Sequence, residues 1–134
     1  MWTTEHAVET RATKEQIWET WRDVRRWPEW NHDLERAELA SPFVAGSTIT
    51  MTPIGDEPIA LTIVDAREPE LFVDEARLGD TVVRTIHRVD AATDGHRRIV
   101  YRMEIDGPGG EVIGPAISDD FPEVLAGLVA QAEG

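Results

Sequence analysis

Large apolar side chains occupy every second position of the stretch Ile99-Val100-Tyr101-Arg102-Met103-Glu104-Ile105. After the break Gly107-Pro108-Gly109-Gly110, apolar residues instead recur at intervals of three and four, at Ile117, Phe121, Val124, Leu125, Leu128 and Ala132. A period of two is typical of a strand with one covered face, and a period near 3.6 is typical of an amphipathic helix. The chain is therefore predicted to end in a strand followed by a helix.

The period of two extends upstream over most of the chain, from Leu34 to about Ile105. Apolar residues alternate with threonine and alanine in the segments 48–52 and 59–64. Turn-forming residues separate the strands at Gly46, Gly55-Asp56, Glu68-Pro69, Gly79-Asp80 and Asp94-Gly95. Such short connections favour an antiparallel meander over units in which helices alternate with parallel strands.

The N-terminal part is predicted to hold one strand, roughly Trp2 to Thr10, and two short helices. Thr13 and Gln16 have the spacing of a capping box, in which each side chain satisfies the other residue's backbone N–H. A helix of about ten residues is expected to follow. Pro28 interrupts the helical pattern and favours a second short helix or turn over residues 26–31, because proline suits a helix start and not its interior.

The start of the last helix can be interpreted in two ways, because Pro122 lies within the apolar pattern. The helix could be kinked at Pro122. Alternatively, Asp120 caps it, Pro122 lies in the first turn and Glu123 completes a capping box. We favour the second reading, with a separate turn around Pro115–Ser118.

Composition restricts the classes of function. The 134 residues suit one domain, and 13 Lys+Arg against 26 Asp+Glu give a net charge of −13. This charge argues against a nucleic-acid partner, since phosphate binding needs a positive field. Cysteine is absent, which excludes disulfides and thiolate chemistry. Lys14 is the single lysine, which disfavours Schiff-base chemistry.

Targeting and membrane signals are also missing from the pattern. The first residues carry no basic segment followed by an apolar run, so no signal peptide is expected. No apolar stretch approaches about 20 residues, so no membrane insertion is expected. We predict a cytoplasmic protein.

The element order predicts an α+β fold, in which a curved antiparallel sheet of about seven strands wraps around the C-terminal helix. A strongly twisted sheet that wraps one helix usually leaves a gap between them. We therefore expect an apolar cavity between the sheet and the helix.

Three stretches carry a resemblance to a known family. They are Ile17-Trp18 through Val24 with Arg26-Trp27-Pro28-Glu29-Trp30-Asn31; His87–Asp90 with Asp94-Gly95 and Ile99–Tyr101; and Glu104-Ile105-Asp106-Gly107-Pro108. Together they resemble the helix-grip fold of the START/Bet v 1-like (SRPBCC) superfamily, and within it the polyketide cyclase/dehydrase and lipid-transport group. The resemblance spans the whole chain as one ligand-binding domain, residues 1–134. It implies a hydrophobic ligand (a lipid, a polyketide or an aromatic molecule) under the C-terminal helix.

The apolar side chains in the inward strand phase, with the apolar face of the last helix, are candidate cavity wall or ordinary core. The candidate ligand-binding residues are Trp30, Met51, Leu61, Ile63, Phe72, His87, Tyr101, Met103, Ile117, Phe121 and Leu125. Trp27 and Trp30 could form a lid, or they could plug the junction between the small helices and the sheet.

Three polar residues are candidate acids or bases. If Val83, Thr85 and His87 point inward, pairing across Asp94-Gly95 places His87 near Tyr101 or Met103, where it could orient a carbonyl or move a proton. The opposite register turns His87 outward. In the strand 71–78 each phase buries a carboxylate, and a buried Asp74 would have a raised pKa and could act as acid or base. A bulge or a wet cavity mouth is the alternative explanation of this strand.

No metal and no cofactor is expected. The four histidines, His6, His32, His87 and His96, lack paired spacing. The main functional prediction is a carrier or binding protein for a small hydrophobic molecule. A cofactor-independent cyclase or dehydratase that uses His87, Tyr101 or Asp74 is the alternative, and an interaction module with a filled pocket is the third reading. The sequence does not decide whether the protein forms a homodimer.

Overall fold

The computed structural model describes all of residues 1–134. In chain order the elements are β1 (Trp2–Thr10), α1 (Lys14–Arg22), the 3-10 helix η1 (Val24–Glu29), β2 (Leu34–Leu39), β3 (Thr48–Pro53), β4 (Ile59–Arg67), β5 (Leu71–Leu78), β6 (Thr81–Ala91), β7 (Arg97–Asp106), α2 (Gly110–Ser118) and α3 (Phe121–Glu133).

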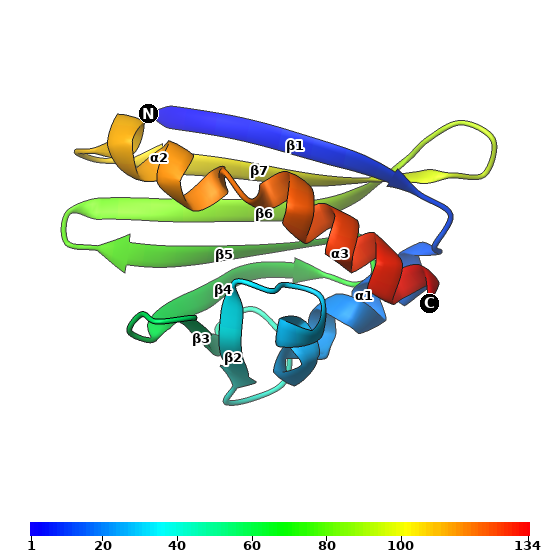
Figure 1. The fold of residues 1–134 in the computed structure, drawn as a ribbon, viewed down its shortest axis with the longest axis horizontal. Coiled ribbons are helices and arrows are strands. Elements are labelled where there is room, and N and C mark those ends of the chain that lie inside the picture. Colours follow the sequence, from blue (N-terminus) through cyan, green and yellow to red (C-terminus); the bar gives the residue numbers. More distant parts are fainter.

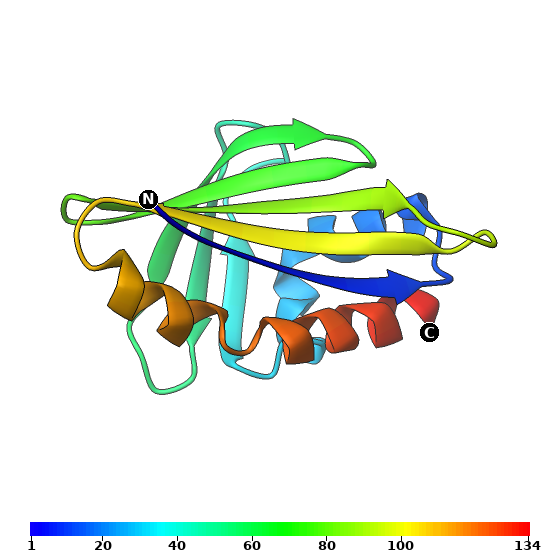
Figure 2. The same cartoon turned by 90° about the horizontal axis from the view of Figure 1, so that it is seen from above.

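The seven strands form one antiparallel sheet in the order β1-β7-β6-β5-β4-β3-β2. The first strand therefore pairs with the last, and the remaining strands follow as a meander. Figures 1 and 2 show the sheet curving around the helices, with α3 lying along the concave side beneath β1 and β7. The predicted α+β architecture, with two short helices after the first strand, is confirmed.

The local signals around α1 form as the sequence predicts. Thr13 Oγ1 accepts from the Gln16 backbone N–H at 3.1 Å, and Gln16 Oε1 accepts from the Thr13 N–H at 2.8 Å, so the capping box is complete. The apolar face of α1 (Ile17, Trp18, Trp21) is buried. Pro28 lies inside η1, whose 3-10 geometry forms only a short helix.

The C-terminal segment corrects part of the prediction. The expected turn around Pro115–Ser118 is the end of a complete helix, α2. Helix α3 begins at Phe121 with Pro122 in its first turn, as favoured, but Asp120 makes no side-chain capping hydrogen bond. The expected capping box with Glu123 is therefore wrong: Asp120 has helical dihedral angles and directs its carboxyl to Asp33 instead.

Helix α2 packs closely on the sheet edge because its buried residues are small: Gly110, Gly114 and Ser118. A Cβ atom built on Gly114 would lie 2.4 Å from the indole ring of Trp2. This face brings the helix backbone close against β1 and β7.

Two register shifts bend the sheet. One lies between Leu34 and Arg36 in β2, and the other lies between Ile63 and Asp65 in β4. The second leaves Val64 as the extra residue, with its side chain turned to the exposed surface. Bulges of this kind increase strand twist and re-aim neighbouring side chains, and they occur often beside functional sites.

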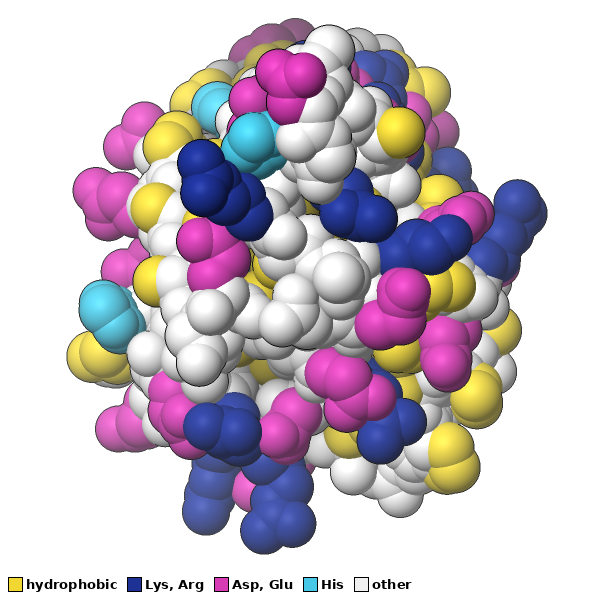
Figure 3. Space-filling view, turned by 90° about the vertical axis from the view of Figure 1, so that its right-hand side faces the viewer, with side chains coloured by type: hydrophobic (Ala, Val, Ile, Leu, Met, Phe, Trp, Pro, Cys, Tyr) yellow, Lys and Arg dark blue, Asp and Glu magenta, His cyan; other side chains and the backbone are white.

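The outer face of the sheet carries arginines that pair with acidic side chains. Arg84 pairs with Glu75 and Glu104, and Arg102 donates to Glu104 at 2.9 Å. Figure 3 shows basic and acidic side chains interspersed at the end of the molecule that holds the C-terminus. Exposed pairs of this kind add little stability, so the fold depends on the apolar side.

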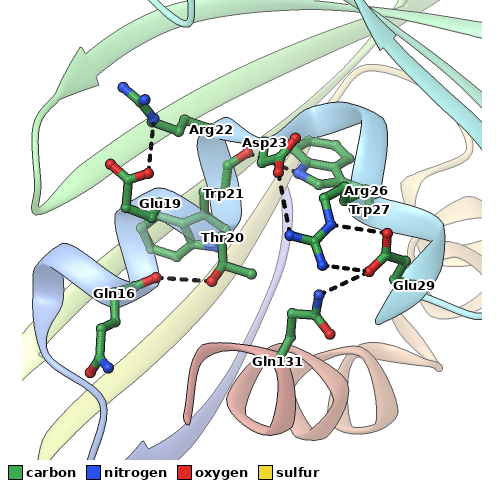
Figure 4. A network of polar contacts seen from close by, with 10 residues as sticks. All are labelled: Gln16, Glu19, Thr20, Trp21, Arg22, Asp23, Arg26, Trp27, Glu29 and Gln131. Atoms are coloured by element: carbon green, nitrogen blue, oxygen red, sulfur yellow. Dashed lines mark hydrogen bonds and ion pairs between the residues drawn. The ribbon is translucent and has the colours of Figure 1, made fainter. Parts of the chain in front are cut away.

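Helix α3 is held against η1 at one close contact. A Cβ atom on Gly127 would lie 2.1 Å from the Trp30 carbonyl oxygen, so only glycine permits this approach. Beside it, Gln131 donates to Glu29 at 3.2 Å, and Glu29 also accepts from Arg26 (Figure 4). The contact therefore joins the last helix to the short helices.

We expect Gly127→Ala to lower the free energy of unfolding by about 2 kcal/mol, because the added methyl group clashes with fixed backbone. Helix propensity alone would change stability in the opposite direction, by up to about 1 kcal/mol. Urea denaturation measures the effect. Ala126→Gly, at the exposed neighbouring position, is the control and should cost only its propensity. A variant Gly127→Ala as stable as the original protein would contradict this packing.

Candidate functional site: a cavity under the sheet

A cavity of about 650 Å³ lies between the concave face of the sheet and helices η1, α2 and α3. Of the 27 residues that line it, 17 are hydrophobic. This volume lies within the range of sites that hold small organic molecules, roughly 300–1,000 Å³.

Most of the candidate ligand-binding residues line this cavity. They are Trp30, Met51, Leu61, Phe72, His87, Tyr101, Met103, Ile117 and Phe121. Ile63 and Leu125 do not: their side chains are fully enclosed in the core. Ile63 adjoins the β4 bulge, and Leu125 lies on α3 where this helix packs closely, so neither reaches open space.

The two tryptophans after α1 are both core and wall. Trp27 and Trp30 are each 6% exposed and line the cavity. Trp27 Nε1 donates to the Trp21 carbonyl at 2.9 Å, whereas Trp30 Nε1 is buried without a partner. They belong to the hydrophobic core and also line the cavity, so they combine features of both interpretations.

The polar part of the wall comes from three neighbouring strands. Register places Phe72, His87 and Tyr101 side by side on β5, β6 and β7. Asp74, two residues along β5, lies opposite Thr85. All four polar or aromatic candidates face the cavity, so the inward registers of Asp74 and His87 are the ones that form.

The His87 ring is fixed in one orientation by its neighbours. It stacks on Phe72 at a centroid distance of 3.8 Å and meets Tyr101 edge-on at 4.6 Å. Its Nδ1 lies 3.1 Å from the Phe72 carbonyl oxygen. A carbonyl can only accept, so Nδ1 carries the proton and Nε2 presents a lone pair. Burial lowers the pKa of His87 to about 3, which keeps the ring neutral.

Asp74 presents its carboxyl to the cavity in an apolar setting. The residue is 5% exposed, and its Oδ2 lies 4.0 Å from His87 Nε2, beyond hydrogen-bond distance. It pairs in register with Ile63, directly before the β4 bulge. Burial, and secondarily the charge of Glu75, raises the pKa of Asp74 to about 7. The carboxyl group therefore exchanges a proton near neutral pH.

Tyr101 contributes a hydroxyl that is already half satisfied. Trp21 Nε1 donates to the Tyr101 oxygen at 3.0 Å, which leaves the phenolic proton free to be donated. Burial raises the pKa of Tyr101, so the phenol stays protonated. The site thus combines a proton-exchanging carboxyl, a neutral imidazole acceptor and a phenol donor.

Carboxyl groups also line the mouth of the cavity, and no pattern in the sequence marks them. Asp33 and Asp120 lie next to each other, and the exposed residues Asp56, Asp119 and Glu123 also line the cavity there. Burial first, and then the Asp33 hydrogen bond and charge, raises the pKa of Asp120 to about 7. These residues occupy turns and helix ends, where no sequence period marks the inward direction.

A curved antiparallel sheet that holds an apolar cavity beneath a C-terminal helix defines a helix-grip protein. Residues 1–133 match the family described as polyketide cyclase/dehydrase and lipid transport. The chain belongs to this family.

Solved structures share the fold. Norcoclaurine synthase from Thalictrum flavum, in complex with dopamine and hydroxybenzaldehyde, has a TM-score of 0.77 at 13% identity, over 96% of this chain and 84% of that one. A START superfamily protein from Mycobacterium smegmatis has a TM-score of 0.76 at 14% identity, over 98% and 97%. The di-domain ARO/CYC protein BexL has a TM-score of 0.77 at 12% identity, over 99% and 50%.

At such identities the likeness concerns the fold alone. No curated protein matches the sequence significantly. None of the helices has the length and apolar character needed to cross a membrane. No three His, Asp or Glu side chains gather in an arrangement that could hold a metal ion.

We expect Asp74→Asn to stabilise the protein at pH 8 by on the order of 3 kcal/mol, and to give no gain at pH 4. The raised pKa means that folding favours the protonated carboxyl. Below about pH 4 this group does not reduce the free energy of unfolding, and that free energy falls as the pH rises from there through about 7.

Denaturant titrations of both proteins at the two pH values measure this difference. Glu104→Gln is the matched control, because Glu104 lies on the outer face of β7 and accepts from Arg102 Nε at 2.9 Å. It should give no stabilisation at either pH. Equal effects of Asp74→Asn at pH 4 and pH 8 would refute the buried, protonated carboxyl.

Proposed function

We propose that the protein binds one small, largely apolar molecule in the cavity, with a polar end of that molecule directed at Asp74, His87 and Tyr101. The observation that carries this proposal is a 650 Å³ space lined by 17 hydrophobic residues, with its buried polar groups gathered on three adjacent strands. Burial of the apolar body supplies the binding free energy, and the polar groups supply orientation.

The open volume argues against an interaction module with a filled pocket. A pocket filled by its own side chains would leave no space of this size. The aromatic wall is also packed together, because Trp21 meets Phe72 edge-on at 5.2 Å and lies tilted against Tyr101 at 6.4 Å. A ligand would enter a site that is already formed.

Filling the cavity should abolish binding. We expect Met103→Trp to weaken binding of the neutral probe N-phenyl-1-naphthylamine by at least about tenfold, because the indole occupies ligand space and a loss of about 1.4 kcal/mol already gives that factor. Probe fluorescence measures the affinity. Arg102→Trp, on the adjacent outward position of β7, is the control and should bind normally. Equal binding by both variants would place the probe elsewhere.

Proton-transfer catalysis is the second candidate, and one observation favours it. Asp74 has a pKa of about 7 and faces the same cavity as a phenol donor. A general base works best when its pKa lies near the operating pH. Asp74 fits this role better than His87, whose pKa of about 3 makes it a weak base.

The simplest reaction of this kind is enolisation of a ketone, the first step of cyclisation or dehydration of a β-keto chain. The Asp74 carboxylate takes a proton from the carbon next to the carbonyl group. The C–H electron pair forms the new C=C bond, and the carbonyl π electrons move to oxygen. The Tyr101 hydroxyl donates a hydrogen bond to that oxygen, and Asp74 then returns its proton to carbon or oxygen.

This activity can be measured as hydrogen–deuterium exchange. We expect the protein to catalyse exchange of the protons next to the carbonyl of 4-phenyl-2-butanone, with a rate that rises through about pH 7 as Asp74 ionises. Asp74→Asn should reduce the catalysed rate by about 10²-fold. Glu104→Gln, on the outer face of β7, is the control. If exchange never exceeds the buffer rate while the naphthylamine probe binds, the protein is a carrier and this second candidate fails.

A further inference from the structure

The charged residues around the cavity are all of one sign. Six carboxyl groups line it, one deep in the cavity and five at the mouth, and none of the chain's 13 Lys and Arg residues does. Outside the cavity the same strands alternate the two signs, as in the Arg84 and Arg102 pairs. The cavity therefore differs from the outer surface in having no internal countercharge.

The deepest of these carboxyl groups has no protein partner. Asp74 is only 5% exposed. Its nearest basic group is the neutral His87 ring, whose Nε2 lies 4.0 Å away and carries no proton to donate. A buried carboxylate without donors is unfavourable unless something else supplies them. The donor must come from the occupant of the cavity, or the group must bind a proton instead.

The walls beside Asp74 suit a cation that has left water. Phe72, Tyr101 and Trp21 form a continuous aromatic cluster in which Trp21 and Phe72 lie 5.2 Å apart. Aromatic faces attract cations, and most strongly where water is excluded. At the mouth, Asp33 and Asp120 face each other, so a passing cation would meet negative charge before it reaches Asp74.

We propose that the ligand of this cavity is an amphipathic amine, whose protonated nitrogen pairs with the Asp74 carboxylate while its apolar body lies against the aromatic wall. The negative charge of the cavity disfavours fatty acids and phosphorylated lipids, because their anionic head groups would meet six carboxyl groups and no cation. This inference rests on the proposed binding function and specifies the chemical class of the ligand.

A series with one tail and three head groups tests the proposal. Octylamine, 1-octanol and octanoate are allowed to displace N-phenyl-1-naphthylamine at pH 8, where octylamine is protonated. We expect octylamine to bind at least about tenfold more tightly than octanol, and octanoate to bind most weakly. In Asp74→Asn the preference of octylamine over octanol should fall by about the same factor.

The matched control is Glu111→Gln. It removes one negative charge from the exposed first turn of α2, and Glu111 does not line the cavity. It should keep the full preference for the amine. If Glu111→Gln and Asp74→Asn reduce the preference equally, octylamine binds to the acidic surface and the inference is overturned.

The remaining outcomes separate the inference from the function on which it rests. If the naphthylamine probe binds and octanol or octanoate displaces it as well as octylamine, the ligand-class inference fails and the binding function stands. If neither the probe nor any octyl compound binds, the proposed function fails and the inference fails with it.

Discussion

The structure depends on a mismatch of length and shape between one curved sheet and the helices that must cover it. The 13 residues of α3 span about 20 Å at 1.5 Å per residue, whereas the 11 residues of β6 span about 37 Å. Helix α3 is anchored at the η1 end, where Gly127 touches the Trp30 carbonyl. Helix α2 packs only along β1 and β7, where its small buried residues bring its backbone close to Trp2, and the space under the other strands stays unfilled. The cavity is the direct result.

Burial beneath the sheet changes the protonation chemistry of the three polar groups on the inner wall, Asp74, His87 and Tyr101. On the outer face of β5, Glu75 is paired with Arg84. One residue away, Asp74 points inward, and burial raises its pKa to about 7. An asparagine or an apolar residue at position 74 would avoid that cost. A group that destabilises the fold and faces a cavity is better explained by function than by stability.

The sequence predicted those features that have a period, and it failed where the period breaks. Local patterns in the sequence predict strands β3, β4 and β7 and the Thr13 capping box, and tertiary contacts reinforce these patterns. The inward direction of Asp74 could not be derived, because both phases of β5 bury a carboxylate, and only the tertiary pairing with β6 selects the phase in which Phe72 and Asp74 face the cavity. The sequence predicts a turn around Pro115–Ser118, whereas these residues end helix α2, whose close approach to Trp2 requires small residues such as Gly114. The acidic rim lies in turns, which carry no periodic signal.

Asp74 and His87 are a buried acid and a buried base on one wall of the cavity, and their opposite pKa shifts limit how strongly the free energy of unfolding depends on pH. Alone, Asp74 makes stability fall as the pH rises from about 4 to 7. Alone, His87 makes stability fall as the pH drops from about 6.5 to 3, because unfolding lets the ring take up a proton. Between about pH 4 and 6.5 the two effects oppose each other. In that window the unfolded pair holds one proton on the imidazole, and the folded pair holds one proton on the carboxyl. Folding thus moves a proton from base to acid without changing the proton count, and it leaves a carboxylic acid and a free imidazole lone pair facing the same cavity.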